Sequence, residues 1–502
     1  MKHIKFYIIF IAAIILRIYG LTWDQGMHLH PDERMLIMVA DRIHFFTQMN
    51  PDFFNYGSLP IYFLKVTAQL IDIILGSNVS TYDGMLMHGR YLSIIAEGIS
   101  IIYIYKLVRK LFPHDQTNKI ALYSSCFYAI SFFLIQNSHF FTVDIFLNCF
   151  TIILMYLLLR LDSHPRRNDT LKMLTFIGII FGAMLSTKIT AIIFLPIICL
   201  TIFLKNYFTY KNIPKVFKYF FLHFIFFISI FLATFFVFMP YAFINAHQFI
   251  TEIKQQLQMN NDPYIFPYTL QYVGTLPYVY YLKNIFFWGL GPVISILSII
   301  GITLASIKII KSYKNYNFTS TSLSASKFLI FILFYLIYFL IIGKSSVKFM
   351  RYMLPIYPFF IIMAGYGLEE MSKVKCQMSK IIPKIFILAA IIWTFMFVNI
   401  YSTQHTRITA SNWINQNIPS GSSIAVEHWD DRLPLLHEEI YNIKELPLYN
   451  LPDNQIKWQE INSILIKSDY IIIASNRLYI PLQKLSDCSK YSKCYPITSE
   501  YY

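Results

Sequence analysis

Residues 4–20 read IKFYIIFIAAIILRIYG, and His30-Pro31-Asp32-Glu33 follows about ten residues later. The first stretch is apolar over nearly the length that a transmembrane helix needs, about 20 residues. It has no small-residue cleavage site and more apolar runs follow, so we interpret it as a retained membrane helix and not as a signal peptide. Two neighbouring carboxylates just past a membrane crossing are a poor structural choice unless chemistry needs them there.

The composition favours lipid as the solvent. Hydrophobic residues make up 56% of the 502 residues and charged residues only 14%, whereas a soluble domain carries about 25% charged residues. The net charge of +15 does not indicate nucleic acid, because the Lys and Arg residues lie in loops between apolar runs. The six Cys residues show no spacing typical of a metal site.

The apolar runs predict a mainly α fold, a polytopic membrane helix bundle. With the first run they give eleven expected transmembrane helices, at 4–20, 90–108, 120–138, 141–159, 173–187, 189–204, 218–239, 285–307, 327–343, 353–371 and 384–400. Basic residues gather in alternate connections, starting with Lys2 and Lys5 and continuing with Arg109 and Lys110. Because cytoplasmic loops are rich in Lys and Arg, we expect a cytoplasmic N-terminus in the plasma membrane and an extracytoplasmic C-terminus.

This topology makes residues 1–400 the membrane module, with a long first outer loop at 21–89 and a second outer segment at 241–284. Residues 59–75 are apolar enough to suggest one more span, but Lys65, Gln69 and Asp72 recur at helical spacing on one face. A helix with a polar stripe is typical of the membrane interface, so we expect interfacial helices within the first outer loop.

The tail from 401 to 502 differs in character. It holds 9 Lys and Arg against 11 Asp and Glu, and its short apolar runs are bounded by turn residues. We interpret it as a small α/β domain on the outer face. Cys488 and Cys494 lie within it, and both a disulfide and free thiols remain open.

His30-Pro31-Asp32-Glu33 has three possible meanings. Proline at the first helical position followed by acidic residues is typical of a helix start and needs no function. A carboxylate at the membrane surface could instead accept a proton from a hydroxyl group during catalysis. A metal site built from His28, His30, Asp32 and Glu33 is the third option, although their spacing is not specific.

Charged residues elsewhere beside the expected spans are further candidates. Asp144 opens an apolar run, where an ionised carboxylate costs about 2.5–3.5 kcal/mol at the bilayer centre and less at the headgroups. Lys188 interrupts two apolar runs and either snorkels to the interface or binds a phosphate. Lys344, Lys348 and Arg351 crowd an outer loop and need an anion, such as a lipid phosphate, and Arg90 is a further candidate to join them.

Short motifs in this order resemble a known family. They are His30-Pro31-Asp32-Glu33, Gly57-Ser58-Leu59-Pro60-Ile61-Tyr62, Arg90-Tyr91-Leu92-Ser93, Asp144, residues 178–188 and Arg351-Tyr352-Met353-Leu354-Pro355. Together they resemble the polyprenyl-phosphate-dependent glycosyltransferases of the GT-C class, which include protein O-mannosyltransferases and lipid A aminoarabinose transferases.

The nearest resemblance is to a family 39-like subgroup. Its landmarks match Thr275-Leu276-Pro277-Tyr278, Trp288-Gly289-Leu290-Gly291, Glu427-His428-Trp429-Asp430-Asp431 and Ser475-Asn476-Arg477-Leu478-Tyr479.

The resemblance implies an inverting glycosyltransferase at the outer face of the membrane. It implies a sugar donor on a polyprenyl phosphate and an acceptor hydroxyl on a protein, glycan or lipid. Asp32 would be the catalytic base, and Glu33 and Asp144 are the other catalytic candidates. The substrate-binding candidates are His30, Tyr62, Arg90, Lys188, Lys344, Lys348, Arg351 and Tyr352. We expect no cofactor, with a divalent metal left open, and no nucleic acid partner. A transporter or flippase of a lipid-linked sugar is the alternative function.

Overall fold

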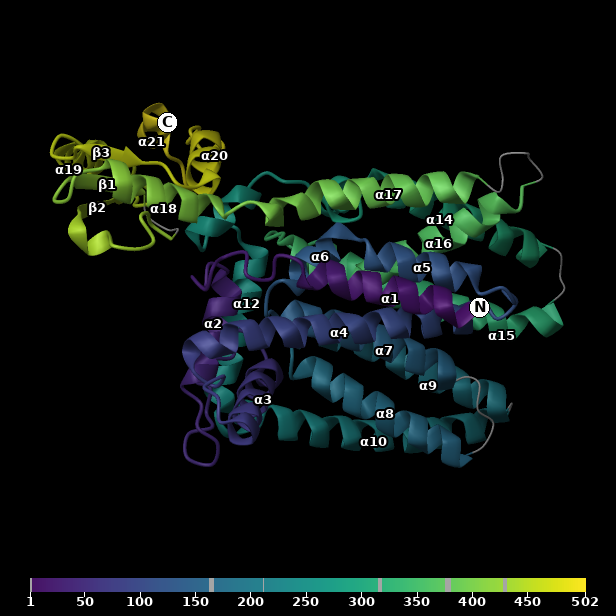
Figure 1. Cartoon of the computed structure of the whole chain (residues 1–502). Coiled ribbons are helices and arrows are strands. Elements are labelled where there is room, and N and C mark those ends of the chain that lie inside the picture. Colours follow the sequence, from purple (N-terminus) through teal and green to yellow (C-terminus); the bar gives the residue numbers. More distant parts are fainter. Residues whose placement is uncertain (1, 162–166, 211, 315–317, 375–380, 428–430) are drawn as a thin grey trace.

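The computed structural model describes all residues except 1, 162–166, 211, 315–317, 375–380 and 428–430. Long helices lie side by side in a bundle (Figure 1). They are α1 (Lys2–Ile18), α4 (Tyr82–Leu111), α5 (Lys119–Ala129), α6 (Phe132–Ser138), α7 (Val143–Leu161), α8 (Arg167–Leu185), α9 (Leu195–Tyr210), α10 (Ile213–Phe238), α14 (Pro292–Lys314), α15 (Phe318–Gly343), α16 (Tyr357–Ser372) and α17 (Ile382–Val398).

The prediction of a mainly α membrane bundle is confirmed, but the count of eleven crossings is not. In the described parts of the chain, seven helices are long and apolar enough to cross a membrane, or eight if the bent pair α5 and α6 is one span. The count is lower because several expected spans are short or broken: α1 has 17 residues, α16 has 16, and α5 meets α6 at 55°.

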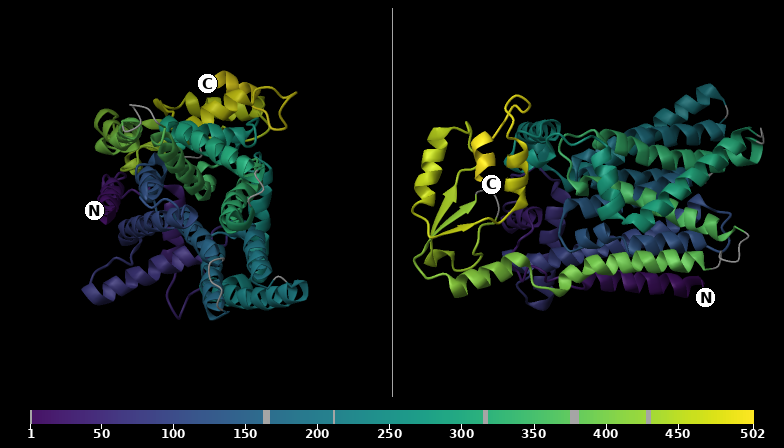
Figure 2. Two further views of the ribbon diagram at one scale, coloured as in Figure 1. Left: turned by 90° about the vertical axis from the view of Figure 1, so that its right-hand side faces the viewer. Right: turned by 90° about the horizontal axis from the view of Figure 1, so that it is seen from above.

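Helix α3 (Ser58–Leu75) is one of the seven by length and hydropathy. Seen along the bundle, however, it extends sideways across the end of the other helices (Figure 2, left). Its polar stripe is used inside the protein: Lys65 donates to backbone oxygens of Asp41 and Ser80, and Asp72 accepts backbone N–H groups of Val79 and Ser80. An interfacial position for α3 stays a prediction. A helix at the membrane interface would have to lie across the end of the bundle, as α3 does.

Several shorter elements and the C-terminal domain gather at one end of the bundle. Helices α2 (Pro31–Asp41) and α12 (Ala246–Asn261) lie there beside the C-terminal domain, while the N-terminus lies at the opposite end (Figure 1). A short 3-10 helix at Pro267–Tyr272, η2, and another at Met350–Ile356, η4, complete this end. The two ends of the chain therefore lie at opposite ends of the bundle, while the side that faces the cytoplasm stays a prediction.

The predicted small α/β domain is confirmed. Its three strands form a parallel sheet in the order β2-β1-β3, with β1 (Ser423–Glu427) between β2 (Asn442–Leu446) and β3 (Tyr470–Ile472). The helices α18 (Thr406–Asn417), α19 (Gln455–Leu465), α20 (Asn476–Lys484) and α21 (Pro496–Tyr501) belong to the same tail. We keep the domain boundary near residue 400 as a proposal, because α17 ends at Val398 and α18 begins at Thr406.

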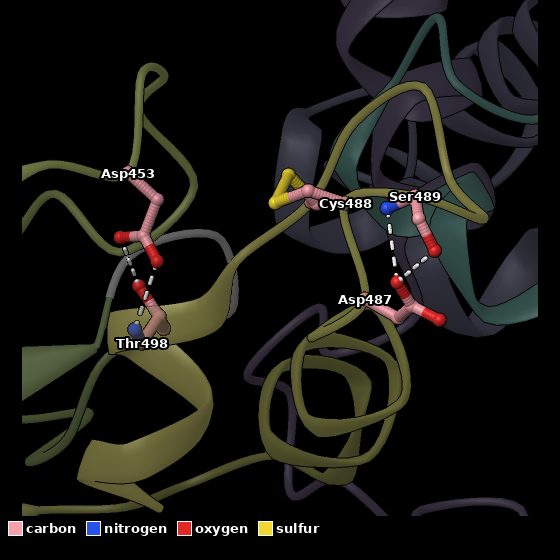
Figure 3. Close-up of a disulfide and its surroundings, with 6 residues drawn as sticks. Asp453, Asp487, Cys488, Ser489 and Thr498 are labelled. Atoms are coloured by element: carbon pink, nitrogen blue, oxygen red, sulfur yellow. Dashed lines mark hydrogen bonds between the residues drawn. A yellow bond between two sulfur atoms is a disulfide. The ribbon is translucent and has the colours of Figure 1, made fainter.

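Local contacts stabilise the turns of this domain. Cys488 and Cys494 form a disulfide across six positions of sequence, and Asp487 accepts hydrogen bonds from Ser489 beside it (Figure 3). Asp453 accepts both the backbone N–H and the hydroxyl of Thr498, which joins the start of α19 to α21 (Figure 3). Of the two alternatives, the structure therefore contains the disulfide and not the free thiols.

The C-terminal domain contacts the segment 241–284 and helix α2 of the bundle. Lys484 donates to the backbone oxygen of Val273, and Lys493 donates to that of Tyr264. Arg34 of α2 forms an ion pair with Asp431 at 2.8 Å. These contacts hold the domain over the end of the bundle where α2 begins.

Candidate active site

Asp32 lies in the first turn of α2 and makes two strong contacts. One carboxylate oxygen is 2.9 Å from Arg351 Nη2, and the other accepts the Tyr56 hydroxyl at 2.9 Å. The side chain keeps 20% of its surface exposed. Asp32 is therefore held rigidly while it remains within reach of another molecule.

A second ion pair lies beside the first. Lys188 Nζ is 2.7 Å from Asp144 Oδ1, and Arg351 Nε is 3.6 Å from Asp144 Oδ2. Only 2% of the Asp144 side chain is exposed, and Lys188 also lies 4.3 Å from the centre of the Tyr352 ring. Arg351 thus joins the two carboxylates, so residues 32, 144, 188 and 351 form one charged cluster.

Asp32, Lys188 and Arg351 of this cluster line a cavity of about 770 Å³, whereas the buried Asp144 contacts the two cations and is not among the lining residues. Part of the cavity wall is polar, and the remainder is apolar. The polar lining includes His30, Asp32, Tyr56, Lys188, Asn260, Tyr268, Arg351, Tyr352 and Arg477, and the apolar lining includes Met35, Ile189, Ile253, Leu257, Ile342 and Phe349. A volume of this size and a mainly apolar wall with a few converging polar groups are typical of ligand sites.

Local sequence explains why α2 begins where it does. The His30 ring accepts the backbone N–H of Glu33 as a side-chain cap, and Pro31 occupies the first turn. Asp32 and Glu33 then lie at the positive end of the helix dipole. The helix-start meaning of this stretch is confirmed, and it is compatible with a catalytic one because a capped helix fixes its first carboxylate.

A glycine brings Tyr56 and Lys188 together. The N–H groups of Gly57 and Leu59 donate to the backbone oxygens of Thr187 and Ser186, both at 3.0 Å. A Cβ atom on Gly57 would lie 2.0 Å from the Ser186 oxygen, so only glycine permits this approach. The two loops therefore run against each other and deliver their functional side chains to one wall of the cavity.

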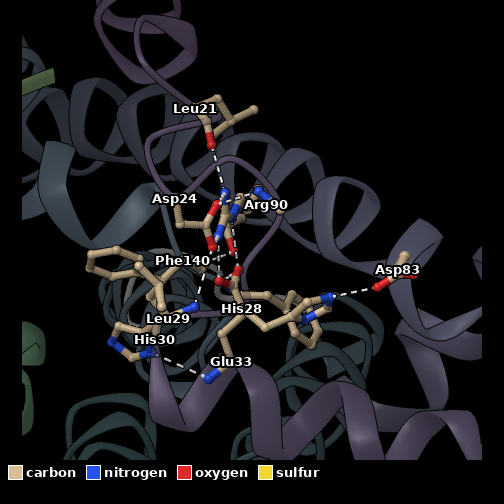
Figure 4. A network of polar contacts seen from close by, with 12 residues as sticks. Leu21, Asp24, His28, Leu29, His30, Glu33, Asp83, Arg90 and Phe140 are labelled. Atoms are coloured by element: carbon tan, nitrogen blue, oxygen red, sulfur yellow. Dashed lines mark hydrogen bonds and ion pairs between the residues drawn. The ribbon is translucent and has the colours of Figure 1, made fainter. Parts of the chain in front are cut away.

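Glu33 and Arg90 lie outside the cavity, in a buried cluster of their own (Figure 4). Arg90 contacts Glu33 at 2.7 and 3.1 Å, Asp24 at 2.8 and 2.9 Å, and the Leu21 oxygen at 2.7 Å. The Phe141 N–H also donates to Glu33 at 2.8 Å. Arg90, Asp24 and Glu33 have no exposed side-chain surface.

The structure therefore corrects the expectation that Glu33 acts on substrate and that Arg90 binds its phosphate. Both charges are already satisfied by each other and by Asp24, with no surface left for a ligand. A buried charge needs such partners, because an uncompensated one is strongly destabilising.

Four other candidates do not line the cavity either, namely Asp144, Tyr62, Lys344 and Lys348. The Tyr62 hydroxyl donates to the Met49 oxygen at 2.8 Å, and the buried Lys348 donates to the Ser346 oxygen at 2.9 Å. Lys344 is exposed near the same loop. Of the substrate-binding candidates, the structure brings His30, Lys188, Arg351 and Tyr352 to the cavity.

The environment sets the charge of two groups at the cavity. Burial would raise the pKa of Asp32, but the guanidinium of Arg351 and the hydrogen bond from Tyr56 lower it below its usual value. Burial lowers the pKa of His30 to about 4. At neutral pH, Asp32 is therefore ionised and His30 is neutral.

The four candidate metal ligands of the sequence do not form one group. His28 Nε2 lies 3.1 Å from Asp83 and Glu33 contacts Arg90 (Figure 4), whereas His30 and Asp32 line the cavity. Within the described residues, no three His, Cys, Asp or Glu side chains come together in a way that could hold a metal ion.

Several residues that contact the candidate residues were not themselves predicted from the sequence. Tyr56 precedes a glycine in the first outer loop, and that glycine was the only local signal for it. Asp24, one of the partners of Arg90, was not a candidate either. Asp431 was noted only as part of the landmark at 427–431, and the structure makes it the partner of Arg34. The landmark at 427–431 is described only in part, because His428, Trp429 and Asp430 lie outside the described residues.

The chain was compared with known proteins. Residues 83–245, about a third of the chain, match a family model described as dolichyl-phosphate-mannose-protein mannosyltransferase. No curated protein matches the chain.

Several solved structures are similar. The oligosaccharyltransferase AglB from Archaeoglobus fulgidus, solved with an inhibitory peptide and a dolichol-phosphate, is 12% identical over 86% of this chain and 62% of that chain, with a TM-score of 0.54. This protein therefore spans 62% of that relative. The apo form of the A. fulgidus oligosaccharyltransferase is 12% identical over 100% of this chain and 72% of that chain, with a TM-score of 0.57. ArnT from Cupriavidus metallidurans, bound to undecaprenyl phosphate, is 10% identical over 93% of this chain and 89% of that chain, with a TM-score of 0.48.

At this identity the two oligosaccharyltransferase structures establish the fold, and the family match is a sequence similarity confined to residues 83–245. The resemblance drawn from the motifs is confirmed at this level: the chain has the GT-C fold of a multi-pass membrane protein, and part of it is similar to the protein mannosyltransferases.

Proposed function

We propose that the protein transfers a sugar from a polyprenyl-phosphate donor to an acceptor hydroxyl at the outer face of the plasma membrane, with inversion of the anomeric centre. One observation carries the proposal. An ionised, partly exposed carboxylate, Asp32, and two cations, Lys188 and Arg351, meet at a single cavity that also has an apolar wall.

The two cations fit a phosphate of the donor. Lys188 and Arg351 lie on either side of Asp144 and are oriented by it. Fixed cations of this kind hold a phosphate and stabilise the negative charge that grows on it as the sugar leaves. The apolar part of the cavity, with Ile189 and Leu257, suits the first isoprene units of the lipid.

Asp32 fits the role of the base. The acceptor hydroxyl attacks the anomeric carbon, and its proton passes to the Asp32 carboxylate. The new glycosidic carbon–oxygen bond forms while the bond from the anomeric carbon to the phosphate oxygen breaks, and the polyprenyl phosphate leaves with that electron pair. A single displacement inverts the configuration at this carbon.

Substrate binding would also release the base. Without substrate, Arg351 is paired with Asp32. A donor phosphate competes for Arg351 and weakens this pair, which makes the carboxylate more basic as the acceptor arrives. Tyr56 keeps the Asp32 side chain in place during this exchange through its hydrogen bond.

The test is transfer from undecaprenyl-phosphate-linked sugars, offered as a panel to the purified protein with acceptors extracted from cell envelopes. Asp32→Asn should lower the rate by about 10²–10⁴-fold, the usual contribution of a general base. Glu439→Gln serves as the control, since that glutamate is exposed in the tail, away from the cavity.

Native mass spectrometry of bound undecaprenyl phosphate separates binding from chemistry. We expect Asp32→Asn to keep the lipid, while Lys188→Ala and Arg351→Ala lose it. Near-normal transfer by Asp32→Asn would exclude Asp32 as the base. Movement of intact lipid-linked sugar across vesicles without any cleavage would instead support a flippase.

A further inference from the structure

A second pocket of about 440 Å³ lies between the first outer loop and the C-terminal domain. The loop supplies Trp23, Leu29 and Pro31, and the C-terminal domain supplies the rest. Those residues are His405, Arg407, Asp431, Ala474, Ser475, Asn476, Arg477 and Tyr479. None of the charged cluster at 32, 144, 188 and 351 lines it.

The second pocket adjoins the cavity. Pro31, Asp431 and Arg477 line both spaces, so they form the partition between them. Pro31 directly precedes Asp32, the proposed base. The second pocket therefore borders the cavity that contains the proposed base.

Contacts within the partition keep it in place. Arg34 pairs with the Asp431 carboxylate at 2.8 Å, and Arg407 donates to the Asp431 backbone oxygen. Arg477 is different: its side chain is exposed, and no ion pair is found for it among the described residues. Burial is the main reason for the lowered pKa of His30, and the charge of Arg477 makes a smaller contribution in the same direction.

The chemistry of the lining suits a sugar. Arg477 and Asn476 present planar hydrogen-bonding groups at the start of α20, and Ser475 and Asp431 add oxygen atoms. The Tyr479 ring can pack against the apolar face of a sugar ring, and Trp23, whose ring also contacts His405 and Arg90, is a second aromatic residue of the lining. Planar polar groups together with aromatic rings match a molecule that has hydroxyls around its edge and C–H groups on its faces.

We propose that this second pocket is the acceptor subsite and that its occupant is a saccharide, oriented by Arg477. The inference rests on the proposed transferase function and names the acceptor class for that same site. The donor would occupy the cavity and the acceptor saccharide the second pocket, with the reacting hydroxyl passing Pro31 to reach Asp32. Arg477 is then a specificity-determining residue that does not take part in proton transfer.

The experiment measures two ligands on the full chain in detergent. Native mass spectrometry follows undecaprenyl phosphate, and saturation-transfer NMR in its presence follows a panel of methyl glycosides of glucose, mannose, N-acetylglucosamine and glucuronic acid. Short peptides with Ser or Thr form a second panel. We compare the wild type with Arg477→Ala and Asn476→Ala. The matched control is Arg432→Ala, which removes an exposed arginine of the same domain that pairs with Glu438 and lines neither space.

We expect at least one glycoside to bind the wild type. Arg477→Ala should weaken that binding by about tenfold or more, the loss expected for a hydrogen bond to a charged group. Asn476→Ala should weaken it less, and Arg432→Ala should leave it unchanged. The affinity for undecaprenyl phosphate should stay the same in Asn476→Ala and Arg432→Ala, which change residues outside the donor cavity.

Other outcomes would overturn the subsite. They are binding of the peptides in place of the glycosides, binding of no glycoside while undecaprenyl phosphate is bound, and glycoside binding that Arg477→Ala does not change. Loss of undecaprenyl phosphate in Arg477→Ala would assign the arginine to the donor cavity instead. A wild type that binds no undecaprenyl phosphate would count against the proposed function itself, which keeps the two failures distinguishable.

Discussion

Asp32 and Asp144 are both ionisable residues at the cavity end of the bundle, but their exposure separates their roles. Asp32 keeps 20% of its side-chain surface open, whereas Asp144 keeps 2% and holds Lys188 and Arg351. Only Asp32 can meet an incoming hydroxyl, because a base must lie within hydrogen-bond reach of the proton it takes. Asp144 is better suited to hold the two cations in position.

The charge of Asp32 leads to a pH prediction. Because Arg351 and Tyr56 lower its pKa against the opposing effect of burial, Asp32 stays ionised from neutral pH down past the usual aspartate pKa of about 3.9. The specificity constant kcat/KM should therefore stay constant as the pH falls and decrease only when the pH passes through the lowered pKa of Asp32. The stability that this ion pair contributes is lost over the same acidic range.

Tyr56→Phe tests the cause of that lowered pKa. The variant loses a hydrogen bond to the ionised carboxylate, so the acidic limb of the kcat/KM profile should move to higher pH. Tyr470→Phe is the control, because that exposed tyrosine lines neither the cavity nor the second pocket. An acidic limb that stays in place in Tyr56→Phe would mean that the tyrosine does not tune Asp32.

Arg90 and Arg351 should behave in opposite ways when each is changed to alanine. Arg90→Ala leaves the buried Asp24 and Glu33 without their cation, which should destabilise the protein by about 3–5 kcal/mol. Arg351→Ala removes a partly exposed cation and should abolish donor binding with a much smaller change in melting temperature. Thermal unfolding followed in detergent, beside the lipid-binding assay, distinguishes them. An Arg90→Ala protein with wild-type stability would contradict the structural role.

At the level of the elements, two loops depend on one glycine. Gly57→Ala would place a methyl carbon 2.0 Å from the Ser186 oxygen, in a contact made of backbone on both sides. Neither loop can move a flexible side chain aside, so both must separate, and Tyr56 and Lys188 move with them. We expect the transfer rate to fall strongly and the melting temperature to drop.

Gly421→Ala is an informative comparison for that change. This glycine lies in the tail, and a Cβ there meets nothing within 4 Å, although its φ of +85° makes any side chain strained. It should therefore lower stability without lowering the activity of the folded fraction. Equal activity per folded molecule in Gly57→Ala and the wild type would exclude a positioning role for the loop contact.

The sequence predicted the helical bundle, the start of α2 and the α/β tail, because periodicity, capping residues and short apolar runs are local signals. It did not separate Asp32 from Glu33. Adjacent residues on a helix do not face the same way, so Asp32 turns to the cavity while Glu33 turns into the bundle toward Arg90. Which of the two faces the cavity depends on how α2 packs against α4, and no local pattern records that packing.

At the scale of the whole molecule, the predicted site is assembled from distant parts of the chain. Residues 32, 56, 144, 188 and 351 come from α2, a loop, α7, the turn after α8 and η4. Their convergence could be anticipated only from the family resemblance, since nothing in the spacing of these residues specifies a shared cavity. The cavity is lined by residues of α2, α12 and the C-terminal domain. These elements lie at the end of the bundle opposite the N-terminus (Figure 1), so the side of the membrane on which the tail lies is also the side of the proposed chemistry.

The disulfide allows that side to be tested in intact cells. Cys488 and Cys494 are joined in the tail, and oxidising conditions that maintain a disulfide are found outside the cytoplasm. If the tail is extracytoplasmic, a membrane-impermeant reductant followed by an impermeant maleimide should add two labels to the wild type. The same treatment should add no such labels to the Cys488→Ser/Cys494→Ser double variant, and omission of the reductant should leave the wild type unlabelled at these positions. If the two labels are added only after the membrane is permeabilised, the tail and the cavity face the cytoplasm, and transfer at the outer face is excluded.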